Sequence, residues 1–266
     1  MVDIVNKIKS FPPMKRLLQQ RGLKHYLSLR GSGFHYGRFK DFSEARNWLP
    51  KSKEFDFSDF ANEYISDRSN KIYAFDYPVL LWLRHAFDVG ARSVFDIGGS
   101  IGNQYYSYSK YIKYPTSFDW NVYELPVFAK MGREIALSRN ASQLTFTDHL
   151  DMLQIDADVW IAAGAIEFME NVSIEGLLEN SRVRPRHILL NKLPLHEGDE
   201  FVSTQNIGNG SFVPHHVFNR GKYITRVERC GYRLVDSWTV PDRRFVVPGH
   251  AELSFDEYAG LYFETK

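Results

Sequence analysis

The chain has 266 residues, of which 44% are hydrophobic and 15% aromatic, enough apolar material for one packed α/β core with extensions. Lys and Arg (33) nearly balance Asp and Glu (32), so the formal net charge of +1 creates no field that would favour nucleic acid as a partner. Cys230 is the only cysteine, which excludes an intramolecular disulfide and a cysteine-rich zinc site, and we predict no metal site.

The first 30 residues are locally basic, with seven Lys or Arg against one acid, Asp3. Residues 1–70 predict an N-terminal helical extension that caps the main domain. Such a basic segment is typical of a solvated terminal helix pair broken at Pro12-Pro13, or of a contact with anionic lipid or glycolipid. No apolar run approaches the roughly 20 residues that span a bilayer, and the N-terminus lacks the apolar core of a signal peptide. We therefore expect a cytoplasmic protein. A more specific hypothesis is that its basic N-terminal segment contacts the inner face of the membrane.

Residues 71–266 show an alternation of strand and helix signals. Apolar residues recur at helical spacing from Tyr77 until Gly90 ends the run. A short β-prone run, 93–97, then stops at a pair of glycines, as a buried parallel strand does. The pattern continues with strands predicted at 117–124, 144–147, 158–163 and 187–191, and with helices beginning near 101, 126 and 174.

This βαβ succession indicates a Rossmann-like α/β fold with a mostly parallel seven-stranded sheet and helices on both faces. The last third predicts a helix over 217–229 and two final strands, 233–240 and 261–264, which we expect to pair as an antiparallel edge. The stretch 197–216 is rich in Gly, Asn, Gln, Ser and His and predicts a long loop.

The central signal is the run from Asp96 to Gly102, in which Gly98, Gly99 and Gly102 follow a buried strand and precede a helix. Glycine removes the Cβ that would keep a ligand from the backbone, and the helix beyond offers free amide donors. Glu124 ends the next strand, where a carboxylate is placed to bind both ribose hydroxyls of a nucleoside. Together these residues predict a nucleoside site, with a purely structural glycine turn as the alternative.

The acid before the glycine pair bears on the choice of cofactor. A dinucleotide fold favours G-x-G-x-x-G beneath a pyrophosphate, which an anionic Asp96 would repel. The same charge attracts a ligand that carries an amino group and a sulfonium centre, as S-adenosylmethionine does. Asp148 and Leu125 are predicted to contact the adenine and Ala163 to border the methionine arm, although Asp148 fits an N-cap and the small residues near Ala163 fit close packing equally well.

This pattern resembles motif I and the following acidic residue of class I S-adenosylmethionine-dependent methyltransferases. More narrowly, the chain is similar to a bacterial family of methyltransferases linked to surface-polysaccharide (O-antigen) biosynthesis. The resemblance implies that Asp96, the three glycines and Glu124 bind the cofactor and that the acceptor is a sugar hydroxyl. Its motifs span roughly residues 34 to 264 and are Tyr77-Pro78, Phe95 to Gly102, Glu124-Leu125-Pro126, Asn191 to Leu195, Gln205 to Gly208 and Phe218-Asn219.

Acceptor residues are expected after the fifth strand and in the predicted loop, because ligands of such folds meet at the carboxyl ends of the strands. Asn191, Gln205 and Asn206 carry amides that bind hydroxyl groups. His215 is our candidate general base, because an imidazole with a pKa near 6.5 accepts a proton at neutral pH, and His196 is its nearest rival. A surface role for His215 without chemistry is the alternative.

Three functions therefore remain in view. The leading hypothesis is an O-methyltransferase that acts on a carbohydrate or glycolipid precursor. A non-catalytic partner module that keeps the nucleoside pocket is the second, and a nicotinamide-dependent oxidoreductase, disfavoured by Asp96, is the third.

Overall fold

The computed structural model describes residues 12–52, 54–55, 69–150 and 157–266. Contacts group the chain into two units. The small unit comprises Met1–Phe55, Pro194–Lys222 and Pro241–Tyr258, and the large unit comprises Asp56–Leu193, Tyr223–Val240 and Ala259–Lys266. This grouping differs from the predicted division at residue 70, because the N-terminal segment shares a sheet with residues from the last third of the chain.

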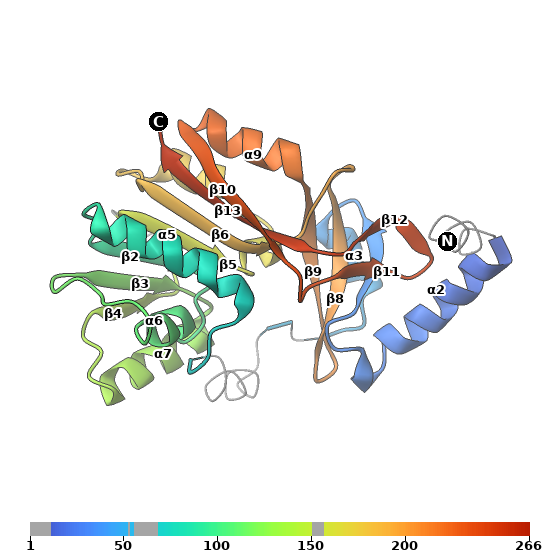
Figure 1. Cartoon of the computed structure of the whole chain (residues 1–266). Helices are drawn as coiled ribbons and strands as arrows, with labels where there is room; N and C mark the ends of the chain where they lie inside the picture. Colours follow the sequence, from blue (N-terminus) through green and yellow to red (C-terminus); the bar gives the residue numbers. More distant parts are fainter. Residues whose placement is uncertain (1–11, 53, 56–68, 151–156) are drawn as a thin grey trace. The chain divides into compact units, whose positions relative to one another are not determined.

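A seven-stranded sheet with strand order β10-β13-β6-β5-β2-β3-β4 forms the centre of the large unit (Figure 1). The strands from β6 to β4 are parallel, and β13 joins β6 antiparallel, so the mostly parallel sheet predicted from the sequence is confirmed. The strands are β2 (Ser93–Ile97), β3 (Asp119–Tyr123), β4 (Leu144–Thr147), β5 (Val159–Ala163), β6 (His187–Leu193), β10 (Tyr232–Val240) and β13 (Tyr258–Thr265).

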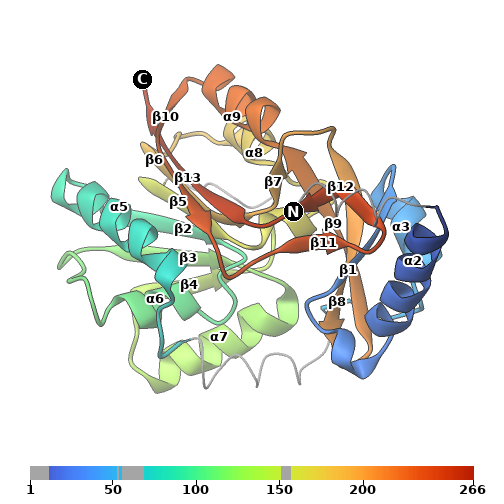
Figure 2. The same ribbon diagram turned by 45° about the vertical axis from the view of Figure 1, so that its right-hand side comes forward.

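Helices cover both faces of this sheet. Figures 1 and 2 show α5, α6 and α7 on one side and α8 and α9 on the other. Pro78 and Pro126 stand in the first turns of α5 and α7, where a missing N–H costs nothing. The helices are α5 (Tyr77–Asp88), α6 (Asn103–Tyr108), α7 (Pro126–Ser138), α8 (Ile174–Asn180) and α9 (Arg220–Arg229), with short 3-10 turns η2 (Ala74–Asp76) and η3 (Ile166–Phe168).

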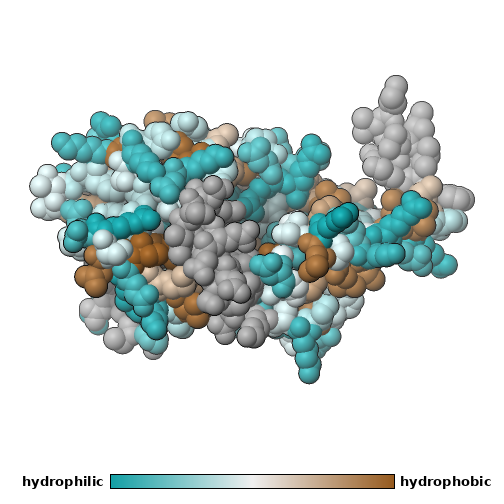
Figure 3. Space-filling model, turned by 90° about the horizontal axis from the view of Figure 1, so that it is seen from below, coloured by the Kyte–Doolittle hydropathy of each residue, from teal (hydrophilic) through white to brown (hydrophobic). Residues whose placement is uncertain are grey.

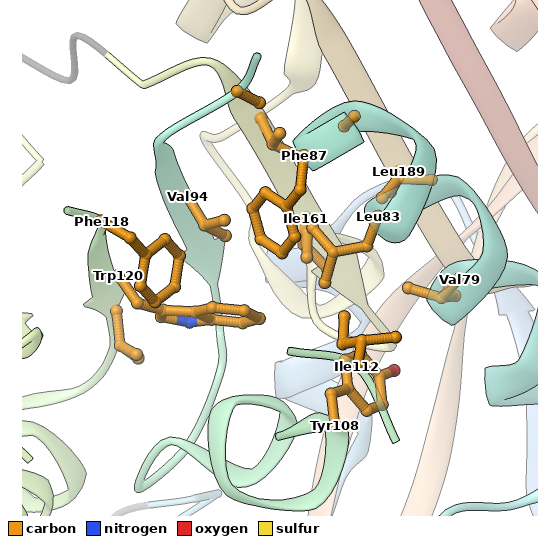
Figure 4. Packing of buried hydrophobic residues seen from close by; sticks show 14 of the residues in the cluster. Val79, Leu83, Phe87, Val94, Tyr108, Ile112, Phe118, Trp120, Ile161 and Leu189 are labelled. Atoms are coloured by element: carbon orange, nitrogen blue, oxygen red, sulfur yellow. The ribbon is translucent and has the colours of Figure 1, made fainter. Parts of the chain in front are cut away.

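The core under α5 shows why the central strands are apolar on both sides. Side chains from α5, α6, α7 and six strands pack together there, with Phe87 and Trp120 among the largest (Figure 4). Val94 of β2 points into this cluster, whereas the next residue, Phe95, points to the other face and is equally buried. Burial on both faces matches a near-continuous apolar run such as 93–97 and requires helices on each side.

The small unit holds a four-stranded sheet of order β1-β8-β9-β7 and a hairpin of β11 and β12. Strand β1 pairs antiparallel with β8, with His35 opposite Gln205. The elements are α2 (Pro12–Tyr26), η1 (Leu29–Gly31), β1 (His35–Phe39), α3 (Phe42–Trp48), β7 (Leu195–His196), β8 (Phe201–Gly208), β9 (Ser211–Asn219), β11 (Phe245–Val247) and β12 (His250–Phe255).

The prediction of a loop over 197–216 is wrong, because most of this segment forms the β8–β9 hairpin. Asn209 and Gly210 form the turn with φ of 51° and 73°, the left-handed pair that a tight hairpin of this twist requires. The polar composition suggested a loop, but Asn-Gly between two β-prone runs is the signal for a hairpin.

The surface of the described residues is mixed. On the face shown in Figure 3, hydrophobic residues form several separate patches among hydrophilic ones. None of the helices that the structure describes is long and apolar enough to cross a membrane.

Candidate functional site

The turn after β2 is held in an unusual backbone conformation. Gly98, Ser100 and Gly102 all have positive φ, of 70°, 56° and 88°. A Cβ on Gly98 would lie 2.2 Å from the Cβ of Ala165, and a Cβ on Gly99 would lie 2.3 Å from Oδ2 of Asp96. The glycines are therefore required by close approach as well as by φ, and Ser100 accepts a conformation that costs a non-glycine residue of the order of 1 kcal/mol.

Asp96 is fully buried at the base of this turn. Its Oδ2 accepts a hydrogen bond from Nε1 of Trp120 at 3.1 Å. Loss of solvent raises the pKa of Asp96 to about 7; the Trp120 hydrogen bond lowers the pKa, the charge of Glu124 raises it and the charge of Lys192 lowers it. The carboxyl group thus lies near its titration midpoint at neutral pH.

Glu124 joins the end of β3 to the glycine turn. Its Oε2 accepts from the backbone N–H of Ser100 and its Oε1 from that of Leu125, both at 2.9 Å. Burial raises the pKa of Glu124, and the two backbone hydrogen bonds oppose that rise. Each carboxylate oxygen keeps a second lone pair for a ligand. The structure therefore brings the predicted acid next to the predicted turn.

Three buried polar atoms around the turn have no hydrogen-bond partner within the described part of the chain: Oδ1 of Asp96, Oγ of Ser100 and Oδ1 of Asn103. Buried polar atoms are normally paired, and leaving one unpaired costs about 1–3 kcal/mol. Their clustering over eight residues indicates a ligand site. Sequence reasoning missed Ser100 and Asn103, although both stand in or directly after the glycine run.

The remaining predicted cofactor residues lie at neighbouring strand ends. Leu125 is 43% exposed and directly precedes α7, and Ala163 is the buried last residue of β5. Asp148 follows β4, where its Oδ1 accepts a hydrogen bond from Nη2 of Arg133 on α7 at 3.4 Å. That contact leaves Oδ2 for a ligand, so the adenine contact of Asp148 stays a prediction.

Asn191 lies in β6 and is fully buried. Its amide donates to the carbonyl of Phe75 at 3.0 Å, while its Oδ1 accepts from the backbone N–H of Lys192 at 3.0 Å and from Nε1 of Trp238 at 3.1 Å. These contacts account for the burial of Asn191 without an acceptor.

The other predicted acceptor residues lie in the small unit. Gln205 stands in β8, and Asn206, 2% exposed, donates to the carbonyls of Tyr26 and Ser28. His196 is partly exposed, but its Nε2 donates to the carbonyl of Asp199 at 2.7 Å. The hydrogen bonds of Asn206 and His196 stay within this unit.

His215 is 1% exposed and belongs to a buried hydrogen-bonded chain. Its Nδ1 donates to the carbonyl of His216 at 3.1 Å, so in the neutral ring Nε2 accepts, and it accepts from Nδ1 of His35 at 3.1 Å. Nε2 of His35 in turn accepts from the hydroxyl of Tyr258 at 3.4 Å. Burial lowers the pKa of His215 to about 4 and that of His35 well below its usual value. These hydrogen bonds explain the burial of both histidines without a catalytic role.

Comparisons with models of protein families and with curated proteins gave no match. Among solved structures, the chain is similar to 1,6-didemethyltoxoflavin-N1-methyltransferase of Burkholderia thailandensis, at 14% identity and a TM-score of 0.51, covering 82% of this chain and 92% of that one. That structure contains 1,6-didemethyltoxoflavin and S-adenosylhomocysteine. Magnesium protoporphyrin IX methyltransferase of Synechocystis matches at 13% identity and a TM-score of 0.48, covering 71% and 81%. The first likeness shows the fold, the Rossmann-like fold found in methyltransferases.

The close approach of Gly99 to Asp96 predicts that one added methyl group will lower the stability of the protein. Gly99→Ala places a Cβ 2.3 Å from Oδ2 of a carboxylate that Trp120 holds in place, so the variant should lose about 1–3 kcal/mol of unfolding free energy. Gly221→Ala in α9, where the new Cβ meets Oδ1 of Asn219 at 3.6 Å, is the control and should lose no stability. Equal urea midpoints for the two variants would contradict the contact.

The histidine pair predicts a loss of stability in mild acid. Because the folded pKa of His215 lies below the usual 6.5, the unfolded state binds the extra proton, and stability falls as the pH drops below about 6.5. Between pH 7 and 5 the wild type should lose about 2 kcal/mol more than His215→Asn, which keeps the donor to the His216 carbonyl. Urea unfolding at both pH values measures this difference. The same pH dependence in both proteins would show that His215 does not carry it.

Proposed function

We propose that the chain is an S-adenosylmethionine-dependent methyltransferase that methylates a hydroxyl of a sugar in a surface-polysaccharide or glycolipid precursor. The observation that carries the donor part is the group of unpartnered buried oxygens of Asp96, Ser100 and Asn103 beside Glu124. The likeness in fold to a methyltransferase crystallised with S-adenosylhomocysteine supports it.

The residues present fit this cofactor. Glu124 offers two carboxylate oxygens at the end of β3, which suit the two adjacent hydroxyls of a ribose. Asp96 and the Oδ1 of Asn103 offer acceptors for the ammonium of the amino-acid part, and the Oγ of Ser100 can donate or accept. A Cβ on Gly98, Gly99 or Gly102 would meet Ala165, Asp96 or Leu144, so these glycines let the turn pack closely around the donor-site residues.

The same residues disfavour a dinucleotide. A pyrophosphate would have to bind above Asp96 and Glu124, two carboxyl groups that already repel each other. Anions bind where backbone N–H groups are free, but the N–H of Ser100 donates to Glu124 and that of Gly98 to the carbonyl of Tyr123. A nicotinamide-dependent oxidoreductase is therefore the weaker hypothesis.

When bound, S-adenosylmethionine supplies a methyl group on a sulfonium that leaves as a neutral thioether. The protein then has mainly to hold the acceptor oxygen in line, so we assign the rate acceleration to alignment. In the described structure His215 and His196 already use ring nitrogens for internal hydrogen bonds. We therefore base no proton transfer on either residue.

The carbohydrate acceptor rests on the sequence resemblance, and it is the finer part of the proposal. Transfer of a labelled methyl group to one of a panel of cell-surface glycans would support it. Labelling only of a non-carbohydrate acceptor would overturn this part and leave the donor site intact. Binding of the cofactor without any methyl transfer would favour the non-catalytic partner module.

The first test of the donor site is the contribution of Glu124 to cofactor affinity. Glu124→Gln removes the charge at constant size, and charge-assisted hydrogen bonds are worth about 1.5–3 kcal/mol, so the affinity for S-adenosylhomocysteine should fall about tenfold or more. Glu134→Gln on the exposed side of α7 is the matched control and should bind as the wild type does. Calorimetry that finds an unchanged affinity in a folded Glu124→Gln protein would remove Glu124 from the site.

The basic N-terminal segment has a described part, α2, and a part before Pro12 that lies outside the described residues. Met14, Leu17, Arg21 and Lys24 are spaced at helical intervals along α2 and all are exposed, and the helix contains no acid. Leu29, directly after it, is 84% exposed. An apolar and basic stripe of this kind binds anionic lipid, and we propose that α2 meets a membrane that carries the acceptor.

This surface is tested by charge reversal. Arg21→Glu combined with Lys24→Glu should abolish sedimentation with vesicles of phosphatidylglycerol and phosphatidylcholine. Salt at 0.5 M should also abolish sedimentation of the wild type, because screening at this ionic strength shortens electrostatic attraction to about 4 Å. The control is Lys222→Glu with Arg229→Glu, an equal charge change at exposed positions of α9. Equal sedimentation of the two double variants would end the proposal.

A further inference from the structure

Lys192 belongs to the motif Asn191 to Leu195, where sequence reasoning assigned it no role of its own, and it is held in a conformation that is unusual for a lysine. It lies in β6 with a φ of 60° and is 8% exposed. A left-handed non-glycine residue costs of the order of 1–3 kcal/mol, and burial of an ammonium costs more, so both persist only where the surroundings enforce them. Such outliers gather at functional sites.

Asn191 holds the backbone of Lys192 in this left-handed conformation. The side-chain oxygen of Asn191 accepts from the backbone N–H of Lys192, while the carbonyl of Asn191 accepts from the N–H of Gly164 at 2.9 Å. Gly164 is itself left-handed, with a φ of 76°. A left-handed residue thus follows the last β5–β6 pair, Ala163 with Asn191, on each strand, while Leu193 of β6 still pairs with Ala259 of β13.

This arrangement places the lysine ammonium at the end of β5. A Cβ on Gly164 would lie 3.1 Å from Cε and 3.3 Å from Nζ of Lys192, so the ammonium packs against the backbone where β5 ends. The next residue, Ala165, is the one that a Cβ on Gly98 would strike, so the segment that the ammonium contacts also packs against the glycine turn. Nζ also lies 5.7 Å from the ring centroid of Phe75, a cation–π contact.

We propose that Lys192 is a positioning residue of the donor site, whose ammonium favours the charged form of the buried Asp96 carboxyl group, the form that binds the ammonium of the donor's amino-acid part. The inference rests on the proposed function, because it assumes that donor. A neutral carboxylic acid would hold an ammonium poorly. Burial drives Asp96 toward the neutral form and Glu124 adds repulsion, whereas the charge of Lys192 acts in the opposite direction.

The titratable and charged groups that face Asp96 come from three elements and one loop. Glu124 follows β3, Lys192 stands in β6, Tyr108 ends α6 and Tyr114 lies in the segment after it. Burial raises the pKa of both tyrosines well above their usual value, so they stay neutral between pH 6 and 9. Removal of the lysine charge should therefore move the titration of Asp96 upward.

The test follows the affinity for S-adenosylhomocysteine by calorimetry from pH 6 to 8.5. A rise of about one unit in the pKa of Asp96 in Lys192→Gln would weaken binding about fivefold at pH 7 and less than about twofold at pH 8.5. Lys192→Arg should restore the wild-type profile. Lys130→Gln, on the exposed side of α7, is the control.

A second readout is independent of the ligand. Carbon-13 NMR of the aspartate carboxyl groups, with Asp96→Asn to assign the signal, should show the same upward shift of the Asp96 titration in Lys192→Gln. Equal weakening at every pH, or an unmoved titration in a folded variant, would overturn the proposal. If the wild type binds no S-adenosylhomocysteine at any pH, the proposed function fails, while the NMR titration still decides whether Lys192 acts on Asp96.

Discussion

The burial of the Asp96 carboxyl group is the constraint on which the rest of the donor site depends. Taking this group out of water favours its neutral form, and one hydrogen bond from Trp120 offsets only part of that cost. Gly99 must be glycine because the carboxylate occupies the space of its Cβ. Asp96 therefore explains why Gly99 must be glycine and, in our proposal, why a buried lysine charge nearby matters for the donor.

The part of the site that could be predicted from sequence is local. The strand 93–97, its glycines and Glu124 follow one another in chain order, and the glycine pair marks where the strand ends. Because the ends of parallel strands β2 and β3 meet at one edge, order along the chain was enough to place Glu124 beside the turn. Asp148 was placed at its strand end in the same way, but its partner Arg133 lies on another element.

What could not be predicted depends on contacts between distant segments. The pairing of β1 with β8 joins residues about 170 positions apart, and no periodicity reports such a pair. That pairing brings His35 next to His215, and the hydrogen bond between them explains the burial of His215 without a catalytic role. The usual pKa of a histidine had suggested a general base. The left-handed φ of Lys192 likewise follows from Asn191 and Gly164, not from any property of lysine. Polar composition also misled over the β8–β9 hairpin, since its Ser, Thr, Gln and Asn are buried or paired across strands.

A crystal structure of the chain grown with S-adenosylhomocysteine tests the donor site most directly. We expect the ribose hydroxyls within hydrogen-bond distance of Glu124, and the ammonium of the amino-acid part facing Oδ1 of Asp96 with the oxygens of Ser100 and Asn103 newly paired. A ligand bound away from the turn between Gly98 and Gly102, or one that leaves these three oxygens unpaired, would contradict this assignment.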